Sequence, residues 1–77
     1  MDNRRKDVRL QLSSQAPSVS VPFIQSFQLP EDEEQVLILH ECRGRSLEQI
    51  AMAMSVSVET VKRRRRAALA KIARTQI

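Results

Sequence analysis

The 77 residues suffice for one small domain, and a domain of this size buries only a thin hydrophobic core. A single cysteine excludes an internal disulfide, and we find no apolar run that could span a bilayer and no signal-peptide pattern. The net charge of +4 is uneven, because residues 57–77 sum to +6, residues 30–56 to −4 and residues 1–29 to +2. This asymmetry indicates either a polyanionic partner at the C-terminal end or two charged faces that neutralise each other within the fold.

Residues 1–29 are predicted to form an arm outside the helical domain, because they are rich in Ser, Gln and Pro. Apolar and polar residues alternate at 8–12 and 19–23, with SSQAPS between the two stretches. Such alternation is typical of strands, so a loose hairpin is one interpretation. A disordered arm is the other, because a lone hairpin is marginal in water and Pro22 cannot donate to a sheet ladder.

Residues 30–77 are predicted to form an all-α domain of three helices, of which the first covers about 30–43. Pro30 suits a first helical turn, where its missing N–H costs nothing. The acidic run at 31–34 then stabilises the positive end of the helix dipole. Gly44, the only glycine, stands where a helix C-cap needs a left-handed residue.

The second and third helices are predicted over about 46–54 and 57–73. Ser46 and Gln49 have the spacing of a capping box at the start of the second helix. Ser57 is a good N-cap for the third helix, whose apolar residues recur with helical spacing. A short helix, a tight turn and a longer basic helix are the parts of a helix-turn-helix motif. The polar face of the third helix is then free to enter a DNA major groove.

The stretch 29–72, LPEDEEQVLILHECRGRSLEQIAMAMSVSVETVKRRRRAALAKI, resembles region 4 of bacterial sigma factors. It resembles the DNA-binding domain of LuxR-type regulators less closely. LPEDEEQVLIL is similar to the first helix of region 4, and SLEQIA and SVETVKRR are similar to its helix-turn-helix. The resemblance implies that the last helix reads the −35 promoter element and that the domain docks on the flap of RNA polymerase.

Three features depart from the region 4 pattern. The turn usually has glycine where this chain has Ser55. An aliphatic residue is usual where Arg65 stands. Aromatic residues are frequent late in the first helix, where this chain has Glu41 and Cys42.

A helical wheel separates the arginines of the third helix by position. Arg63 lies opposite the apolar face and is the best candidate for contact with a base edge or a phosphate. Arg64 and Arg66 lie on the two shoulders, where they suit phosphates of either strand. Arg65 falls inside the apolar arc, and we expect its head to reach out to Glu33 or Glu34. The candidate DNA-binding residues are Ser57, Glu59, Thr60, Lys62, Arg63, Arg64 and Arg66.

A solvated basic face without a ligand is the other interpretation of this run. Four further residues suggest a protein partner. Ile38 and Met52 fall off the predicted core faces, so they either mark a partner surface or are ordinary exposed residues. Phe23 and Phe27 either fold back over the first helix or anchor a partner as part of an extended segment.

Catalysis is not expected, because His40 and Cys42 are the only residues of their types and so short a chain builds no pocket around them. We therefore expect no catalytic residue, no metal and no cofactor. One functional hypothesis is a small transcription regulator that binds double-stranded DNA. The other is a region 4 mimic that binds bacterial RNA polymerase and displaces or modulates the sigma factor. Both imply a monomer in the cytoplasm of a bacterial host, with no membrane contact and no small-molecule substrate.

Overall fold

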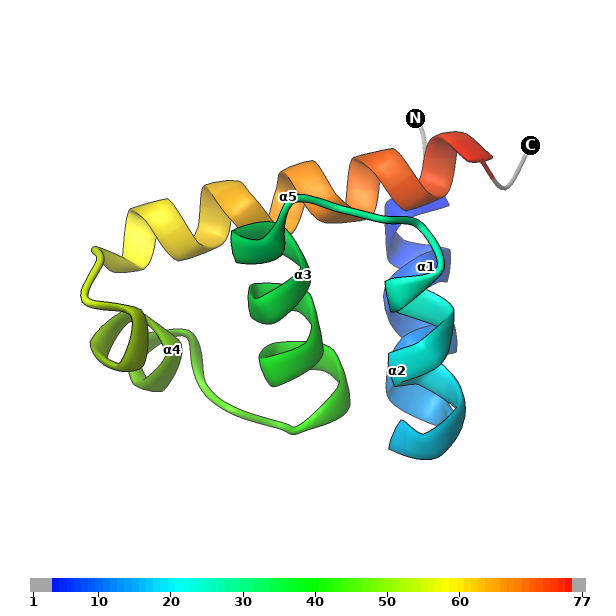
Figure 1. The fold of residues 1–77 in the computed structure, drawn as a ribbon, viewed down its shortest axis with the longest axis horizontal. Helices are drawn as coiled ribbons and strands as arrows, with labels where there is room; N and C mark the ends of the chain where they lie inside the picture. Colours follow the sequence, from blue (N-terminus) through cyan, green and yellow to red (C-terminus); the bar gives the residue numbers. More distant parts are fainter. Residues whose placement is uncertain (1–3, 76–77) are drawn as a thin grey trace.

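The computed structural model describes residues 4–75, and all of its regular structure in this range is helical (Figure 1). The segments are α1 (Arg4–Ser14), α2 (Pro17–Gln25), α3 (Glu31–Leu37), the π-helix η1 (Ile38–Cys42), α4 (Leu47–Met54) and α5 (Val58–Thr75). The long α5 lies across the molecule, and α1, α3 and α4 all pack against it. The predicted all-α fold is confirmed.

The predicted hairpin or disordered arm is wrong within the described residues, because α1 and α2 occupy this part of the chain. Val8 and Leu12 are buried, and they are four residues apart, which places both on one face of a helix. Leu10, between them, is 59% exposed. The apolar residues at 8–12 therefore fit the period of a strand, and Val8 and Leu12 also fit the period of a helix. Packing against the rest of the protein favours the helix, because it buries Val8 and Leu12.

One core cluster joins α1 and α2 to the end of α3, to η1 and to the C-terminal half of α5. Its buried residues are Val8, Leu12, Ile24, Leu37, Ile38, Ala68, Leu69, Ile72 and Ala73. Ile38 is only 8% exposed, so its predicted position on the surface is wrong. The reason is that α1 and α2 cover a side of the first predicted helix that a three-helix domain would leave bare.

The two phenylalanines fold back against the same cluster and are partly buried there. The rings of Phe23 and Phe27 meet edge to face, with their centroids 5.1 Å apart. This arrangement is favourable for aromatic pairs. Of the two predicted arrangements, the structure has the one in which the rings fold back onto the protein, and not an extended segment that carries both rings to a partner.

A second core cluster lies between α3, α4 and the start of α5. It contains Val36, Ile50, Ala51 and Val61, and Val56 from the turn packs against it. Small Ala51 is buried where α4 approaches α5, as a helix-turn-helix requires. The helix-turn-helix therefore has its own core, separate from the cluster under α1 and α2.

The predicted helix ends agree with the observed caps. The Ser46 hydroxyl accepts from the Gln49 N–H at 3.1 Å, and the Gln49 amide oxygen accepts from the Ser46 N–H at 3.0 Å. Gly44 follows η1 with a φ of 71°, the left-handed conformation predicted for it. The first predicted helix ends in a π turn, in which the Arg43 N–H donates to the Ile38 carbonyl at 3.0 Å.

Candidate nucleic-acid interface

The turn between α4 and α5 is built without glycine. Ser55 ends α4 in the left-handed conformation, with a φ of 57°. The Val56 N–H donates back to the Ala51 carbonyl at 3.0 Å, which closes the end of α4. At the start of α5, the Ser57 hydroxyl accepts from the Thr60 N–H at 3.1 Å. This N-cap fixes the end of α5 that a helix-turn-helix presents to base edges.

The predicted DNA-binding residues of the first two turns of α5 lie mostly on the surface. Glu59, Lys62 and Arg63 are exposed, and Thr60 is half-buried with its hydroxyl 3.0 Å from that of Ser57. Lys62 Nζ lies 3.7 Å from Glu59 Oε1, a contact between two exposed groups that water screens. Arg63 has no ion-pair partner among residues 4–75, so its five donors face solvent.

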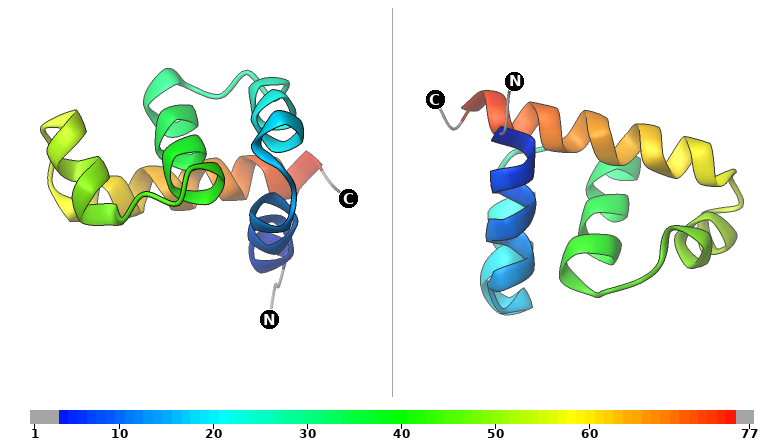
Figure 2. Two further views of the ribbon diagram at one scale, coloured as in Figure 1. Left: turned by 90° about the horizontal axis from the view of Figure 1, so that it is seen from below. Right: turned by 180° about the vertical axis from the view of Figure 1, so that it is seen from behind.

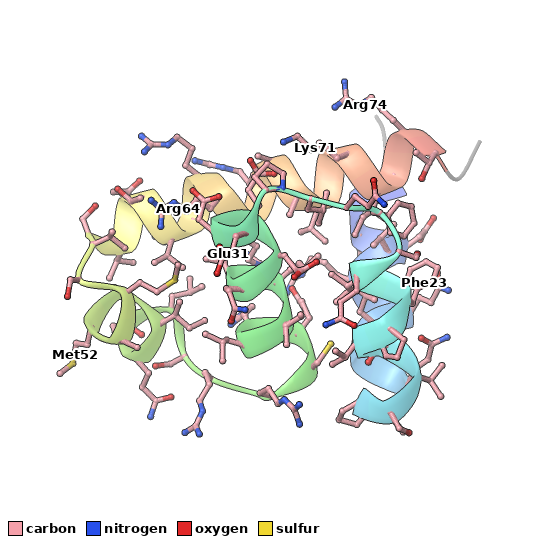
Figure 3. The ribbon with its side chains drawn as sticks, in the orientation of Figure 1. Phe23, Glu31, Met52, Arg64, Lys71 and Arg74 are labelled. Atoms are coloured by element: carbon pink, nitrogen blue, oxygen red, sulfur yellow. The ribbon has the colours of Figure 1, made fainter. Side chains whose placement is uncertain are left out.

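Arg64 differs from Arg63, because it is tied to α3. Its Nε lies 3.1 Å from Asp32 Oδ2, and the side chain is half-buried. Lys71 makes a similar tie farther along α5, donating to both carboxylate oxygens of Glu33 at 2.8 and 3.0 Å. Figure 3 shows Arg64 and Lys71 along α5, near the first turn of α3. Part of the charge asymmetry in the sequence is therefore neutralised within the fold.

Arg65 lies at the edge of the core, but its partner is not the predicted one. Its Nε donates to Glu41 Oε1 at 3.1 Å, instead of to a carboxylate at 33 or 34. Arg9 Nε of α1 approaches the same oxygen at 3.3 Å. The helical position of Arg65 predicted its direction around α5 correctly. The carboxylate that the Arg65 side chain reaches is on η1 and not in the first turn of α3, which depends on how the two helices cross.

The four candidate partner-binding residues do not form one surface. Ile38 is buried, and Phe23 and Phe27 are partly buried against the core. Met52 on α4 is 82% exposed, as predicted. Met52 and Phe23 lie at opposite ends of the molecule in Figure 3.

His40 and Cys42 serve the structure around η1. His40 Nδ1 donates to the Arg45 carbonyl at 2.8 Å, which bridges the connection between η1 and α4. Cys42 is half-buried against the larger core cluster. Within residues 4–75, no three His, Cys, Asp or Glu side chains gather where they could hold a metal ion. None of the described helices combines the length and the apolar character needed to cross a membrane.

A family model described as sigma-70, region 4 matches residues 27–74, well over half of the chain. The chain belongs to the sigma-70 region 4 family. Comparisons with curated proteins and with solved structures found no significant match. The region 4 match covers α3, η1, α4 and α5 and identifies them as a helix-turn-helix DNA-binding domain, which confirms the resemblance seen in the sequence.

The region 4 match leaves out α1 and α2, and here the structure adds residues that sequence reasoning did not single out. Lys6 and Arg9 of α1 line a groove together with Arg65 and Arg66 of α5. Lys6 and Arg9 are three residues apart, a spacing that places two cations on one face of a helix. This spacing indicates a shared surface only if residues 6–9 are helical, whereas the sequence predicted a hairpin or a disordered arm there.

Proposed function

We propose that this region 4 protein is a small transcription regulator that binds double-stranded DNA through the N-terminal half of α5. The observation that carries the proposal is the exposed, unpaired guanidinium of Arg63 on a capped helix end. A helix-turn-helix places the N-terminal residues of its second helix against base edges in the major groove. An arginine there donates two parallel hydrogen bonds to guanine O6 and N7 or to a phosphate.

The other candidate residues take roles that follow from their surroundings. Lys62 and Arg66 are exposed, and they bind phosphates beside the major groove of the DNA. Ser57 caps α5 by accepting from the Thr60 N–H, and the hydroxyls of Ser57 and Thr60 lie together in the first turn, where they can contact a phosphate. Arg64 holds α5 to α3 through Asp32, so we assign it mainly to positioning the recognition helix.

A titration of labelled duplex DNA at several salt concentrations tests this proposal. Each neutralised phosphate contributes about −0.9 to the slope of log K against log[salt], so we expect a slope steeper than −2. Fluorescence anisotropy reports the binding at each salt concentration. A flat response would contradict the proposal, because it would mean that the cations of α5 neutralise no phosphates.

Binding to RNA polymerase is a second candidate function, and the specific support for it is Met52. A flexible thioether side chain that is 82% exposed suits a protein contact, and it stands on α4 and not on the candidate recognition helix α5. A pull-down from bacterial lysate, with and without nuclease, separates the two functions. Polymerase that stays bound after nuclease treatment supports this candidate, and its loss assigns the contact to DNA.

A further inference from the structure

A groove of about 350 Å³ runs between α1 and the middle of α5, and most of its lining is cationic. The lining residues are Lys6, Arg9, Arg65, Arg66 and Leu69. Glu41 partly neutralises the groove, because its Oε1 pairs with Arg9 and with Arg65. Lys6 and Arg66 are exposed and have no ion-pair partner within residues 4–75, so positive charge remains in excess.

The groove lies on the flank of α5 opposite the one that Asp32 and Glu33 of α3 contact. Both α1 and α3 pack beneath α5 (Figure 1), and seen from below they extend towards opposite flanks of it (Figure 2, left). Since α3 and α4 pack on one side of α5, a duplex approaches from a side that they leave open. At the C-terminal half of α5, α1 borders that open side, whereas the N-terminal half is free of α1 (Figure 2, right).

The cations of α5 lead from the recognition end towards this groove. Lys62 and Arg66 are four residues apart, so they lie one above the other on the same face of α5. Lys6 lies across the groove from Arg66, at the α1 wall. The basic surface that begins at the candidate base-reading end therefore continues past α5 onto α1.

The composition of the groove favours phosphate over other ligands. Among the described residues, Leu69 is the one apolar residue that lines it, and no described aromatic side chain does so. It therefore offers no platform on which a nucleobase could stack and no apolar pocket for a peptide anchor. Asp7 is on α1 beside Lys6 but does not line the groove. Guanidinium and ammonium groups along a groove bind phosphate oxygens through charge-assisted hydrogen bonds.

We propose that this groove is a second DNA contact, in which Lys6 and Arg66 bind backbone phosphates of the duplex next to the site that α5 reads. The proposal rests on the proposed function, because it concerns the same duplex. It extends the interface onto α1, which lies outside the matched residues 27–74. Helix α1 then has two roles, since it covers the core together with α2 and it lengthens the DNA footprint.

The test compares Lys6→Gln with Arg43→Gln by anisotropy titrations over a range of salt. Arg43 is an exposed cation in the connection after η1, outside the groove, so its substitution makes the same change in net charge elsewhere. On a duplex that extends beyond the α5 site on both sides, we expect Lys6→Gln to weaken binding about three- to tenfold. The slope of log K against log[salt] should become shallower by about 0.9, as for one lost phosphate contact. Arg43→Gln should leave the slope unchanged.

A shorter duplex that ends at the α5 site supplies the second measurement. There the phosphates proposed for the groove are absent, so Lys6→Gln and the wild type should bind with equal affinity. The proposal is overturned if Lys6→Gln keeps the wild-type slope on the long duplex or loses as much affinity on the short one. If the wild type and Lys6→Gln bind the long duplex with the same affinity and salt slope, the groove contact is wrong but the proposed function stands. If the wild type binds no duplex at all, the proposed function is wrong as well.

Discussion

The guanidinium of Arg65 donates to the carboxylate of Glu41 at 3.1 Å, between α5 and η1. The side chain of Arg65 is 16% exposed and that of Glu41 is 6% exposed, so both charges are largely removed from water. These are two of the positions at which the chain departs from the region 4 pattern, which favours apolar residues at both. The departures are linked, because a buried cation needs a partner and the second substitution supplies it.

This pair predicts strongly non-additive mutations. Glu41→Leu should lower the free energy of unfolding by about 3 kcal/mol, because it leaves the largely buried guanidinium of Arg65 without its main partner. The double variant Glu41→Leu, Arg65→Leu should recover most of that loss, since an apolar pair of similar volume replaces a buried ion pair at little cost. Urea unfolding of the wild type, Glu41→Leu, Arg65→Leu and the double variant measures the coupling. Additive single effects would show that the two side chains do not depend on each other.

The burial of Leu12 tests whether α1 belongs to the folded core. Leu12→Ala should lower the free energy of unfolding by about 2–4 kcal/mol, because it leaves a cavity between α1 and α5. Leu10→Ala on the same helix is the matched control, and the same substitution at this exposed position should cost less than about 0.5 kcal/mol. Thermal or urea unfolding distinguishes them. Equal, small effects would mean that α1 contributes nothing to the core.

Ser55 stores strain in the turn of the helix-turn-helix. Its φ of 57° is costly for a residue with a Cβ atom, whereas glycine adopts it freely. Ser55→Gly should therefore raise the free energy of unfolding by about 0.5–1 kcal/mol, after the greater entropy of glycine in the unfolded chain is counted. A drop in stability would show that the serine makes a compensating contact.

Gly44 provides the converse control for that measurement. Its φ is 71°, and a Cβ added there would meet no atom within 4 Å, so only the backbone opposes a side chain. Gly44→Ala should lower the free energy of unfolding by about 1 kcal/mol. Opposite signs at the two positions would confirm that left-handed strain, and not packing, controls both helix ends.

The free guanidinium of Arg63 predicts a change in specificity. Arg63→Ala should weaken binding to a site selected from random duplexes by about 10- to 100-fold, as expected for one lost bidentate contact to a base. Binding to unrelated duplex should fall only a few-fold, because there Arg63 serves as one phosphate contact among several. Arg43→Ala is the control, since Arg43 is an exposed cation in the connection after η1 and not on the recognition helix. Equal losses on both kinds of duplex would remove Arg63 from base reading.

Much of the helix-turn-helix could be predicted from the sequence, because its signals are local. Capping residues, the left-handed glycine and the helical spacing of apolar residues each act within a few positions, so they identified the ends of α4 and α5 closely. The family pattern added the order of the helices. The exposure of Arg63 also followed from its angle on α5, because a residue opposite the apolar face has no neighbour to cover it.

The N-terminal helices and the ion pairs were decided by tertiary structure. The stretch around Val8 and Leu12 suits a strand or a helix on its own, and the apolar surface of η1 and α5 selects the helix by burying those two residues. That packing in turn buries Ile38, which looked exposed when only three helices were considered. The position of Arg65 on α5 gives the direction of its side chain. The pairing of Arg65 with Glu41 depends on how α5 crosses α3 and η1. The sequence by itself thus determined the motif and its outward face, and long-range packing determined which charges are left free to bind DNA.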